Sequence, residues 1–282
     1  MMPDILYHYC DVSTFMKIVE SRELWLSNAT KMNDYLETVW INHIIDKSLQ
    51  SIEQPKYKEF TEQFVIHYNA NQSSVRPYIF CLSADGDMLS QWRGYADDGR
   101  GIAIGISTKQ LNIEMKLPYT GVNSNLSTGL FPCVYDEIAQ GELVRKVLSQ
   151  GIEIYNKNPQ DPRNVGTSLI ETAPRLRMFS FVFKNPSFAE EMEWRIIHTP
   201  MILAKENDFT YWGSNSEVFF RNRGNDIVSY FKYDLKSIFN TDLIPEIILG
   251  PKSSIEQNDF RLYLQANNLC KTVVKYSKST YR

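Results

Sequence analysis

Apolar residues recur along the chain in short segments that predict alternating strands and helices. Residues 5–10 form an aromatic-rich apolar run, as expected of a short strand. Asp11 or Ser13 can cap the helix that follows, and Phe15, Ile18 and Val19 make its apolar face. Further strands are predicted at 23–27, 78–83, 101–107, 132–136, 188–198, 227–231, 246–250 and 272–276, and further helices at 35–49, 57–68, 85–96, 137–155, 168–177 and 254–268.

The order of these elements predicts an α+β fold rather than a doubly wound one. The strands are short, and repeated strand–helix–strand units are few, so we expect a split and largely antiparallel sheet with flanking helices. The strand at 5–9 is expected to lie near the strand that contains Glu193. The polar break at 69–74 is too short for a domain boundary, so residues 1–282 are predicted to form a single domain. Residues 178–184 fit either an extension of the preceding helix or a separate strand.

Composition and charge narrow the classes of function. Apolar residues make up 43% of the chain and the net charge is −3, so strong nonspecific binding to nucleic acid or to anionic membrane would need a local basic patch. No segment is apolar for long enough to span a membrane, and the first residues do not resemble a targeting signal. The four scattered cysteines favour a reducing, cytoplasmic location. Histidine and cysteine never fall at zinc-ligand spacing, so no metal site is predicted.

The segment 188–198 contains two carboxylates at Glu-x-Glu spacing. As a strand, it places Glu191, Glu193 and Arg195 on one face, with Met192 and Trp194 on the other, apolar face. Two carboxylates on one buried strand face repel each other and are costly to desolvate, which favours a functional interpretation. A surface ion pair between Glu193 and Arg195 is the structural alternative.

Two other segments carry candidate residues that also have structural interpretations. On the helix predicted at 85–96, Trp92 and Tyr95 share a face and could simply pack that helix onto the sheet. His8 could be a strand histidine bonded to a backbone carbonyl. Rossmann, phosphate-loop and nucleophile-elbow motifs are absent from the sequence.

Taken in order, several short motifs resemble a widespread bacterial family known mainly as a domain of unknown function. Members of that family are often associated with phage-defence loci, which implies a bacterial effector of the toxin or toxin–antitoxin kind and a partner protein from the same locus. The motifs are Leu6-Tyr-His-Tyr9, Leu24-Trp-Leu-Ser-Asn28, Asn33-Asp34, Gln91-Trp-x-x-Tyr-Ala96, Glu193-Trp-Arg195 and Ile248-Leu-Gly-Pro251.

The same motifs resemble the ADP-ribosyltransferase superfamily, whose active site is summarised as a His-Tyr-Glu triad. The resemblance implies an ADP-ribosyltransferase-like fold, NAD as the substrate, and His8, Tyr95 and Glu193 at the triad positions. The sequence departs from the pattern at Tyr9, where the polymerase branch commonly has glycine. Glu191 ahead of Glu193 is similar to the Glu-x-Glu of the arginine-modifying branch.

This resemblance implies a role for each candidate residue. Cleaving the bond between nicotinamide and ribose develops positive charge on the ribose, which Glu193 would stabilise. Glu191 would orient or deprotonate the acceptor, and His8 would bind the adenosine-side ribose. Tyr95 would stack on nicotinamide, with Tyr9 as a second platform. The candidates for binding the pyrophosphate are Arg22, Arg76, Arg93, Arg100 and Arg195.

Transfer to an acceptor, hydrolysis of NAD and mere binding all remain open from the sequence. The acceptor could be a protein, a nucleic acid, a small molecule or water. The alternative class is a non-catalytic module that binds a nucleotide or a protein as a sensor or antitoxin-like partner, and the bulk of Tyr9 favours it. Glu193→Gln is expected to keep the fold, and in a transferase it should lower NAD turnover by about a hundredfold or more.

Overall fold

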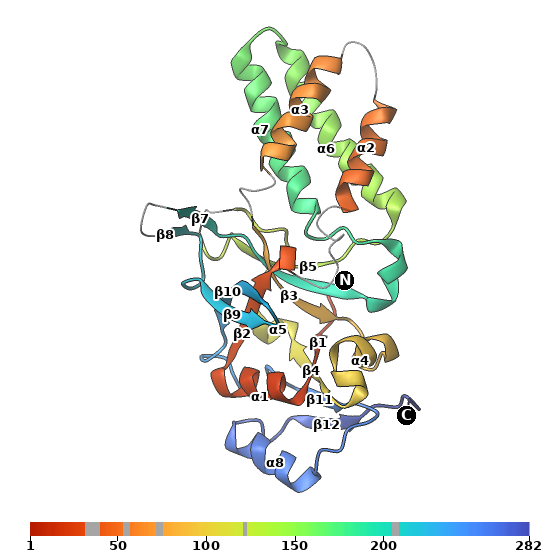
Figure 1. The fold of residues 1–282 in the computed structure, drawn as a ribbon, viewed down its shortest axis with the longest axis vertical. Helices are drawn as coiled ribbons and strands as arrows, with labels where there is room; N and C mark the ends of the chain where they lie inside the picture. Colours follow the sequence, from red (N-terminus) through yellow and green to blue (C-terminus); the bar gives the residue numbers. More distant parts are fainter. Residues whose placement is uncertain (32–39, 53–56, 72–75, 121–122, 205–208, 282) are drawn as a thin grey trace.

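The structure is a computed structural model that describes residues 1–31, 40–52, 57–71, 76–120, 123–204 and 209–281. Over these residues the chain is an α+β fold in which helices flank a large, mainly antiparallel sheet (Figure 1). A bundle of helices lies at one end of the long axis, and the last helix lies at the other. The predicted fold class is confirmed at this level.

The large sheet has ten strands, with the main order β12-β11-β4-β1-β3-β2-β10-β9. β6 pairs with β3, and β5 pairs with β6. Neighbouring strands run antiparallel except for β11 and β12, which are parallel. The strands are β1 (Ile5–Cys10), β2 (Glu23–Asn28), β3 (Tyr78–Ser83), β4 (Ile102–Ser107), β5 (Thr128–Pro132), β6 (Glu193–His198), β9 (Phe219–Arg223), β10 (Asp226–Asp234), β11 (Glu246–Leu249) and β12 (Val273–Tyr276). A separate two-stranded sheet joins β7 (Met201–Ala204) to β8 (Phe209–Trp212).

The sheet splits at β3, which has two different neighbours along one edge. Near its end, Ser83 pairs with Tyr7 of β1, and near its beginning Ile79 pairs with Ser27 of β2. On the other edge, β3 pairs with β6 along its whole length. The middle of β3, residues 80–82, therefore lies where β1 and β2 diverge, and the strand β1 is separated from β6 by β3 alone.

Helices cover the sheet, and local sequence explains the first of them. The Asp11 carboxylate accepts a hydrogen bond of 2.7 Å from the Thr14 amide and caps α1 (Val12–Ser21). The face of α1 formed by Phe15, Ile18 and Val19 is buried, as the pattern predicts. The other helices are α2 (Trp40–Ser51), α3 (Lys58–Asn71), α4 (Leu89–Tyr95), α5 (Thr108–Leu111), α6 (Glu137–Lys157), α7 (Pro162–Phe179) and α8 (Gln257–Ala266), with 3-10 turns η1 (Ala29–Lys31), η3 (Asp97–Gly99) and η4 (Pro186–Glu191).

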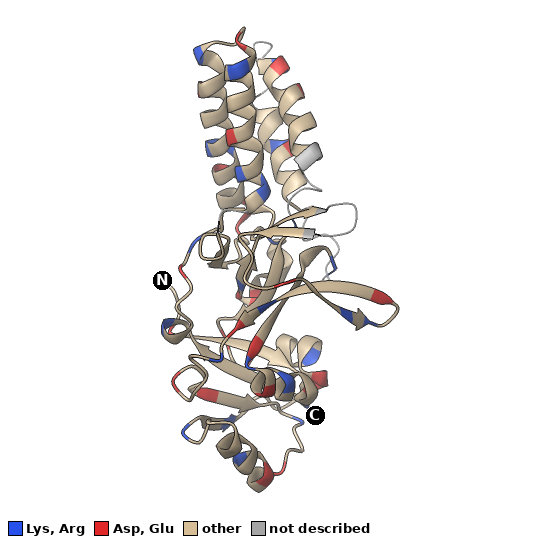
Figure 2. Cartoon of the chain, turned by 90° about the vertical axis from the view of Figure 1, so that its left-hand side faces the viewer, with Lys and Arg blue, Asp and Glu red and all other residues tan. Residues whose placement is uncertain are grey.

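The helical bundle of α2, α3, α6 and α7 shares a hydrophobic core with the sheet. Ile79 of β3 and Ile197 of β6 pack in the same cluster as the inner residues of these helices. Trp194 and Ile196, on the opposite face of β6, belong to the core that includes α1 and α8. Both faces of β6 are therefore buried, whereas charged residues of both signs are spread over the bundle and the sheet (Figure 2).

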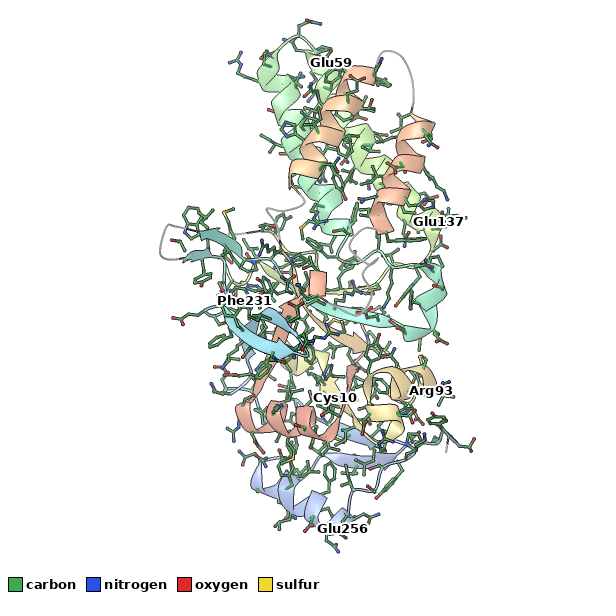
Figure 3. The ribbon with its side chains drawn as sticks, in the orientation of Figure 1. Cys10, Glu59, Arg93, Glu137, Phe231 and Glu256 are labelled. Carbon is green, nitrogen blue, oxygen red and sulfur yellow. The ribbon has the colours of Figure 1, made fainter. Side chains whose placement is uncertain are left out.

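Side chains confirm this distribution of core and surface. Cys10 and Phe231 are 3% and 0% exposed and lie inside the half that contains the sheet (Figure 3). Arg93 and Glu256 are exposed at the surface of the same half. All four cysteines lie among the described residues, and none of them forms a disulfide.

Several predicted elements need correction. The strand predicted at 132–136 lies earlier, at Thr128–Pro132, and Pro132 ends it. The strand that contains Glu193 begins at that residue, because Glu191 ends a 3-10 turn and Met192 adopts a left-handed conformation with φ of 42°. Residues 178–184 are not a strand: α7 continues to Phe179 and a turn follows. The strands β7, β8 and β9 were not predicted.

Some predictions lie outside the described residues. These are the Asn33-Asp34 motif, the part of the helix at 35–49 that precedes Trp40, and residues 72–74 of the polar break. Residues 69–71 of that break belong to α3.

Candidate functional site

A cleft of about 700 Å³ opens where β1 and β2 diverge over β3. Its volume lies in the range of small-molecule sites. The predicted site residues all line it: His8, Tyr9, Tyr95, Glu191 and Glu193. They come from β1, from the end of α4 and from the junction of η4 with β6, so the split of the sheet brings together residues that are far apart in the chain.

Glu193 is the more buried of the two carboxylates and accepts hydrogen bonds from two cationic side chains. The Arg195 guanidinium donates to both of its oxygens, with Nε–Oε1 and Nη2–Oε2 distances of 2.8 and 2.9 Å. Lys184 Nζ donates to Glu193 Oε2 at 2.8 Å, and only 6% of Glu193 is exposed. Burial would raise the pKa of Glu193, but Arg195 and Lys184 outweigh burial and hold that pKa well below its usual range.

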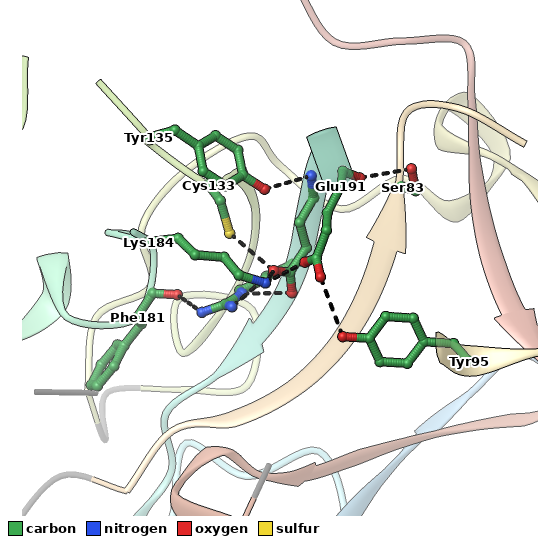
Figure 4. Close-up of polar contacts among 9 residues, drawn as sticks. Ser83, Tyr95, Cys133, Tyr135, Phe181, Lys184 and Glu191 are labelled. Atoms are coloured by element: carbon green, nitrogen blue, oxygen red, sulfur yellow. Dashed lines mark hydrogen bonds and ion pairs between the residues drawn. The ribbon is translucent and has the colours of Figure 1, made fainter. Parts of the chain in front are cut away.

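Glu191 lies nearer to solvent and shares Lys184 with Glu193. Lys184 Nζ bonds to Glu191 Oε2, and the Tyr95 hydroxyl donates to Oε1 at 3.4 Å (Figure 4). The Ser83 hydroxyl donates to the Glu191 carbonyl oxygen at 2.9 Å and anchors the turn to β3. The Glu191 side chain is 12% exposed and faces the cleft from the edge of this ion cluster.

Tyr95 stands at the end of α4 and is 44% exposed. Partial burial and the charge of Glu191 raise the pKa of its hydroxyl, so it is a protonated donor at neutral pH. Its neighbour Trp92 is fully buried and packs α4 onto the sheet, with Nε1 donating to Asp87 at 2.8 Å. The packing interpretation therefore holds for Trp92, whereas Tyr95 is available to a ligand.

His8 belongs to β1 and lines the cleft. Its ring stacks on Phe80 at 4.1 Å, and its Nδ1 lies 2.9 Å from the carbonyl oxygen of Cys81. Because a carbonyl oxygen only accepts, Nδ1 carries the proton and Nε2 is an acceptor. Burial lowers the pKa of His8 to about 4, although the Cys81 bond opposes this effect. His8 is therefore a neutral imidazole at pH 7.

Tyr9 lines the cleft, but its ring and hydroxyl make contacts within the fold. It is 6% exposed, meets the Trp92 ring edge-on, and its hydroxyl donates to the Asp85 carbonyl and accepts from the Met88 amide, both at 2.9 Å. These bonds attach the start of α4 to β1. A stacking role for Tyr9 stays a prediction.

The arginines that the sequence offered for pyrophosphate binding all lie among the described residues, and none lines the cleft. Arg22 caps the end of α1 and lies over Phe239, and Arg93 lies over Tyr281. Arg76 is exposed, and Arg100 forms an ion pair with Asp97. Arg195 forms an ion pair with Glu193. The basic residues that do line the cleft are Lys17, Lys31, Lys184, Arg221 and Arg223.

Lys184 lines the cleft beside both carboxylates, and the sequence does not single it out. It follows the turn after α7, where its amide donates to the Val134 carbonyl at 3.1 Å and its own carbonyl accepts from Gln140 at 3.0 Å. These contacts fix its backbone beside the start of β6. No local sequence pattern identifies Lys184, because its distance from Glu191 and Glu193 depends on how the chain after α7 turns back toward β6.

The described part of the chain holds no group of three or more His, Cys, Asp or Glu side chains placed to bind a metal ion. Nor does any helix in those ranges have the length and apolarity that crossing a membrane requires.

A family model described as a protein of unknown function (DUF2971) matches residues 91–196. This segment contains Tyr95, Lys184, Glu191 and Glu193, whereas His8 and Tyr9 precede it. No curated protein and no solved structure matches the chain. A domain of unknown function is thus present at residues 91–196.

Proposed function

We propose that the cleft binds NAD and cleaves the bond between nicotinamide and ribose. The observation that carries the proposal is the meeting of His8, Tyr95 and the carboxylates of Glu191 and Glu193 in one cleft of ligand size. With water as the acceptor the reaction is hydrolysis, and with a nucleophile of a protein, nucleic acid or small molecule it is ADP-ribosyl transfer. An effector role in phage defence, together with a partner from the same locus, belongs to this proposal.

The geometry favours a division of roles that differs from the one the resemblance implies. Glu191 is the carboxylate nearer to solvent, so it is the better placed to stabilise positive charge on the ribose. Glu193 accepts from both Arg195 and Lys184, and its role in this proposal is to hold Lys184 in position beside Glu191. Tyr95 would then stack on the nicotinamide or donate to it.

The tautomer of His8 leaves one ring nitrogen free to accept a hydrogen bond from a hydroxyl group. Its Nδ1 proton is used by the Cys81 carbonyl, so Nε2 would accept from a ribose hydroxyl. A neutral imidazole also avoids adding another cation to Lys184 and Arg195 near the developing positive charge. This role requires no change in protonation during the reaction.

One observation favours the non-catalytic alternative. Lys184 and Arg195 balance the charges of Glu191 and Glu193, so the cluster offers less net negative charge to a ribosyl cation than two free carboxylates would. A module that only binds a nucleotide would not need that charge. Turnover, rather than binding, distinguishes the two functions.

The proposal is tested by nicotinamide release from NAD by purified protein, with and without cell extract. Glu191→Gln should lower the rate by about a hundredfold, because a preorganised charge is worth a few kcal/mol of barrier. Glu190→Gln is the matched control: Glu190 is exposed, so the same charge change should leave turnover near the wild-type rate. Equal turnover in wild type and Glu191→Gln would contradict the assignment, and wild type that binds NAD without turnover would establish the binding module.

Glu193→Gln needs a stability control, because Glu193 is buried between two cations. The sequence expectation was that this substitution keeps the fold intact. The structure revises it, because the substitution leaves two buried cations short of a partner and should destabilise the protein by about 3 kcal/mol. Its activity is therefore interpretable only at a temperature where the variant is folded.

A further inference from the structure

The cleft extends beyond the carboxylates to a second group of side chains contributed by β2 and β9. Trp25 and Ser27 of β2 line this part, as do Arg221 and Arg223 of β9 and Lys31 at the end of η1. The sequence pattern does not predict β9, and neither arginine belongs to one of the short motifs.

Strand register places Arg221 on the cleft face of the sheet. Arg221 pairs with Val228 of β10, and Tyr230, two residues further along β10, pairs with Ser27 of β2. Side chains at these positions share one face of the sheet. Arg221 reaches across β10, and its Nη2 donates to the Ser27 hydroxyl at 2.9 Å. Ser27 acts as an acceptor here, so its own O–H can donate to a further group.

Arg221 is a half-buried cation without a compensating carboxylate among the described residues. Its Nε is buried and has no hydrogen-bond partner in the part of the chain that the structure describes. Burial and then the charge of Arg223 lower the pKa of Arg221. Native proteins usually pair a buried guanidinium, so an uncompensated one has an energetic cost that calls for a physical reason.

The surroundings of Arg221 add positive charge. Arg223 lies two residues along the same strand, and its Nη1 donates to the Lys31 carbonyl oxygen. Lys31 pairs with Asp226 at 2.8 Å, and the charge of Arg223 also acts on that carboxylate. The indole Nε1 of Trp25 is likewise buried without a partner among the described residues. An anion is the ligand that such a group of donors suits.

We propose that Arg221, with Arg223 and Lys31 adding charge, binds a phosphate group of the ligand in this cleft. The planar guanidinium can donate two parallel hydrogen bonds to phosphate oxygens. This inference rests on the proposed function where it names the pyrophosphate of NAD. The subsite itself would accept any phosphorylated ligand of the cleft.

The test measures binding of ADP and of inorganic pyrophosphate to the full chain by calorimetry at low ionic strength. Arg221→Gln should weaken ADP binding at least about tenfold, since charge-assisted bidentate contacts are the strong ones. Arg76→Gln removes the same charge from an exposed residue outside the cleft and should bind ADP as wild type does. Arg221→Lys keeps the charge but loses the planar guanidinium with its two parallel donors. Its affinity for ADP should therefore lie between that of wild type and that of Arg221→Gln.

Thermal stability supplies an independent readout. If Arg221 is retained for a ligand, ligand-free Arg221→Gln should melt no lower than wild type, because an uncompensated charge is removed. A clear fall in the melting temperature would indicate a structural role and overturn the inference. So would wild type that binds neither probe, or Arg221→Gln that binds ADP normally.

NAD turnover in the same samples separates this inference from the proposed function. Wild type that binds ADP through Arg221 but never releases nicotinamide supports the subsite and refutes the enzyme. An active enzyme whose KM for NAD is unchanged by Arg221→Gln refutes the subsite and leaves the enzyme standing.

Discussion

His8 illustrates how a single residue can connect the fold with the cleft. β1 and β2 diverge at the middle of β3, and His8 there donates to the Cys81 carbonyl from the side chain. It thereby satisfies a backbone group beside the split and presents Nε2 as an acceptor. The structural interpretation made from the sequence, a strand histidine bonded to a carbonyl, is confirmed, and the ligand-binding role stays a prediction that is compatible with it.

A prediction about pH follows from this burial. The pKa of His8 is lowered from 6.5 to about 4, so between these values the unfolded chain binds a proton that the folded chain does not. Stability from the neutral imidazole is complete above pH 6.5 and is lost as the pH falls toward 4, by on the order of 3 kcal/mol. His8→Asn keeps a donor for Cys81 but does not titrate, so it should reduce the slope of unfolding free energy against pH.

Urea unfolding at pH 7, 5.5 and 4.5 measures that slope. His198, whose pKa is also lowered to about 4 by burial, keeps part of the pH dependence in the variant. The lowered pKa of Glu193 acts in the same direction, because the folded chain again binds fewer protons than the unfolded chain, but mainly at pH values below its ordinary 4.5. A variant with the wild-type slope would show that His8 is protonated or solvated in the folded protein.

At the scale of elements, the packing of α6 on α7 depends on one glycine. A Cβ at Gly151 would lie 2.1 Å from Thr172 Oγ1 and 3.2 Å from the Phe60 ring. Ser168 also donates to the Gly151 carbonyl at 2.6 Å, so the two helices approach closely at this point. Gly166, inside α7, has open space where its Cβ would be.

These two glycines predict opposite effects of the same substitution. Gly151→Ala forces Thr172 to shift in a packed core and should lower the free energy of unfolding by about 1–3 kcal/mol. Gly166→Ala improves helix propensity without a clash and should raise it by up to about 1 kcal/mol. Denaturant unfolding of both variants gives the values. A change of the same sign in both would contradict the close approach.

For the whole molecule, the shared core argues that bundle and sheet unfold together. Ile79 and Ile197 pack among the bundle helices, while the opposite face of β6 is buried in the core that holds α1 and α8. β6 therefore belongs to both cores. Because one strand packs in both cores, the two cores are expected to unfold in one step.

This expectation is tested by following thermal unfolding with far-ultraviolet circular dichroism and tryptophan fluorescence. The two signals should change in a single coincident transition. Ile197→Ala, at a fully buried position, should shift both signals together and lower stability by about 2–4 kcal/mol. Ile170→Ala on the exposed face of α7 should leave both nearly unchanged. Two separate transitions would mean that the bundle is an independent domain.

Sequence alone determined the elements whose causes are local. Asp11 and the spacing of Phe15, Ile18 and Val19 define α1 within a few residues. The strand at Tyr78–Ser83 and the residues His8, Tyr95, Glu191 and Glu193 were also identified from short patterns. Capping, periodicity and motif spacing act over distances shorter than an element, so they are visible without a structure.

Only the tertiary structure decided how charge is distributed in the cleft. Lys184 reaches Glu191 and Glu193 because the turn after α7 folds back beside β6, and Arg221 reaches Ser27 because β10 lies between β9 and β2. Both contacts join residues whose proximity no local pattern encodes. The same long-range packing balances the charge of Glu193 and places no compensating carboxylate beside Arg221 among the described residues, because the energy of a buried charge depends on every group that packs around it.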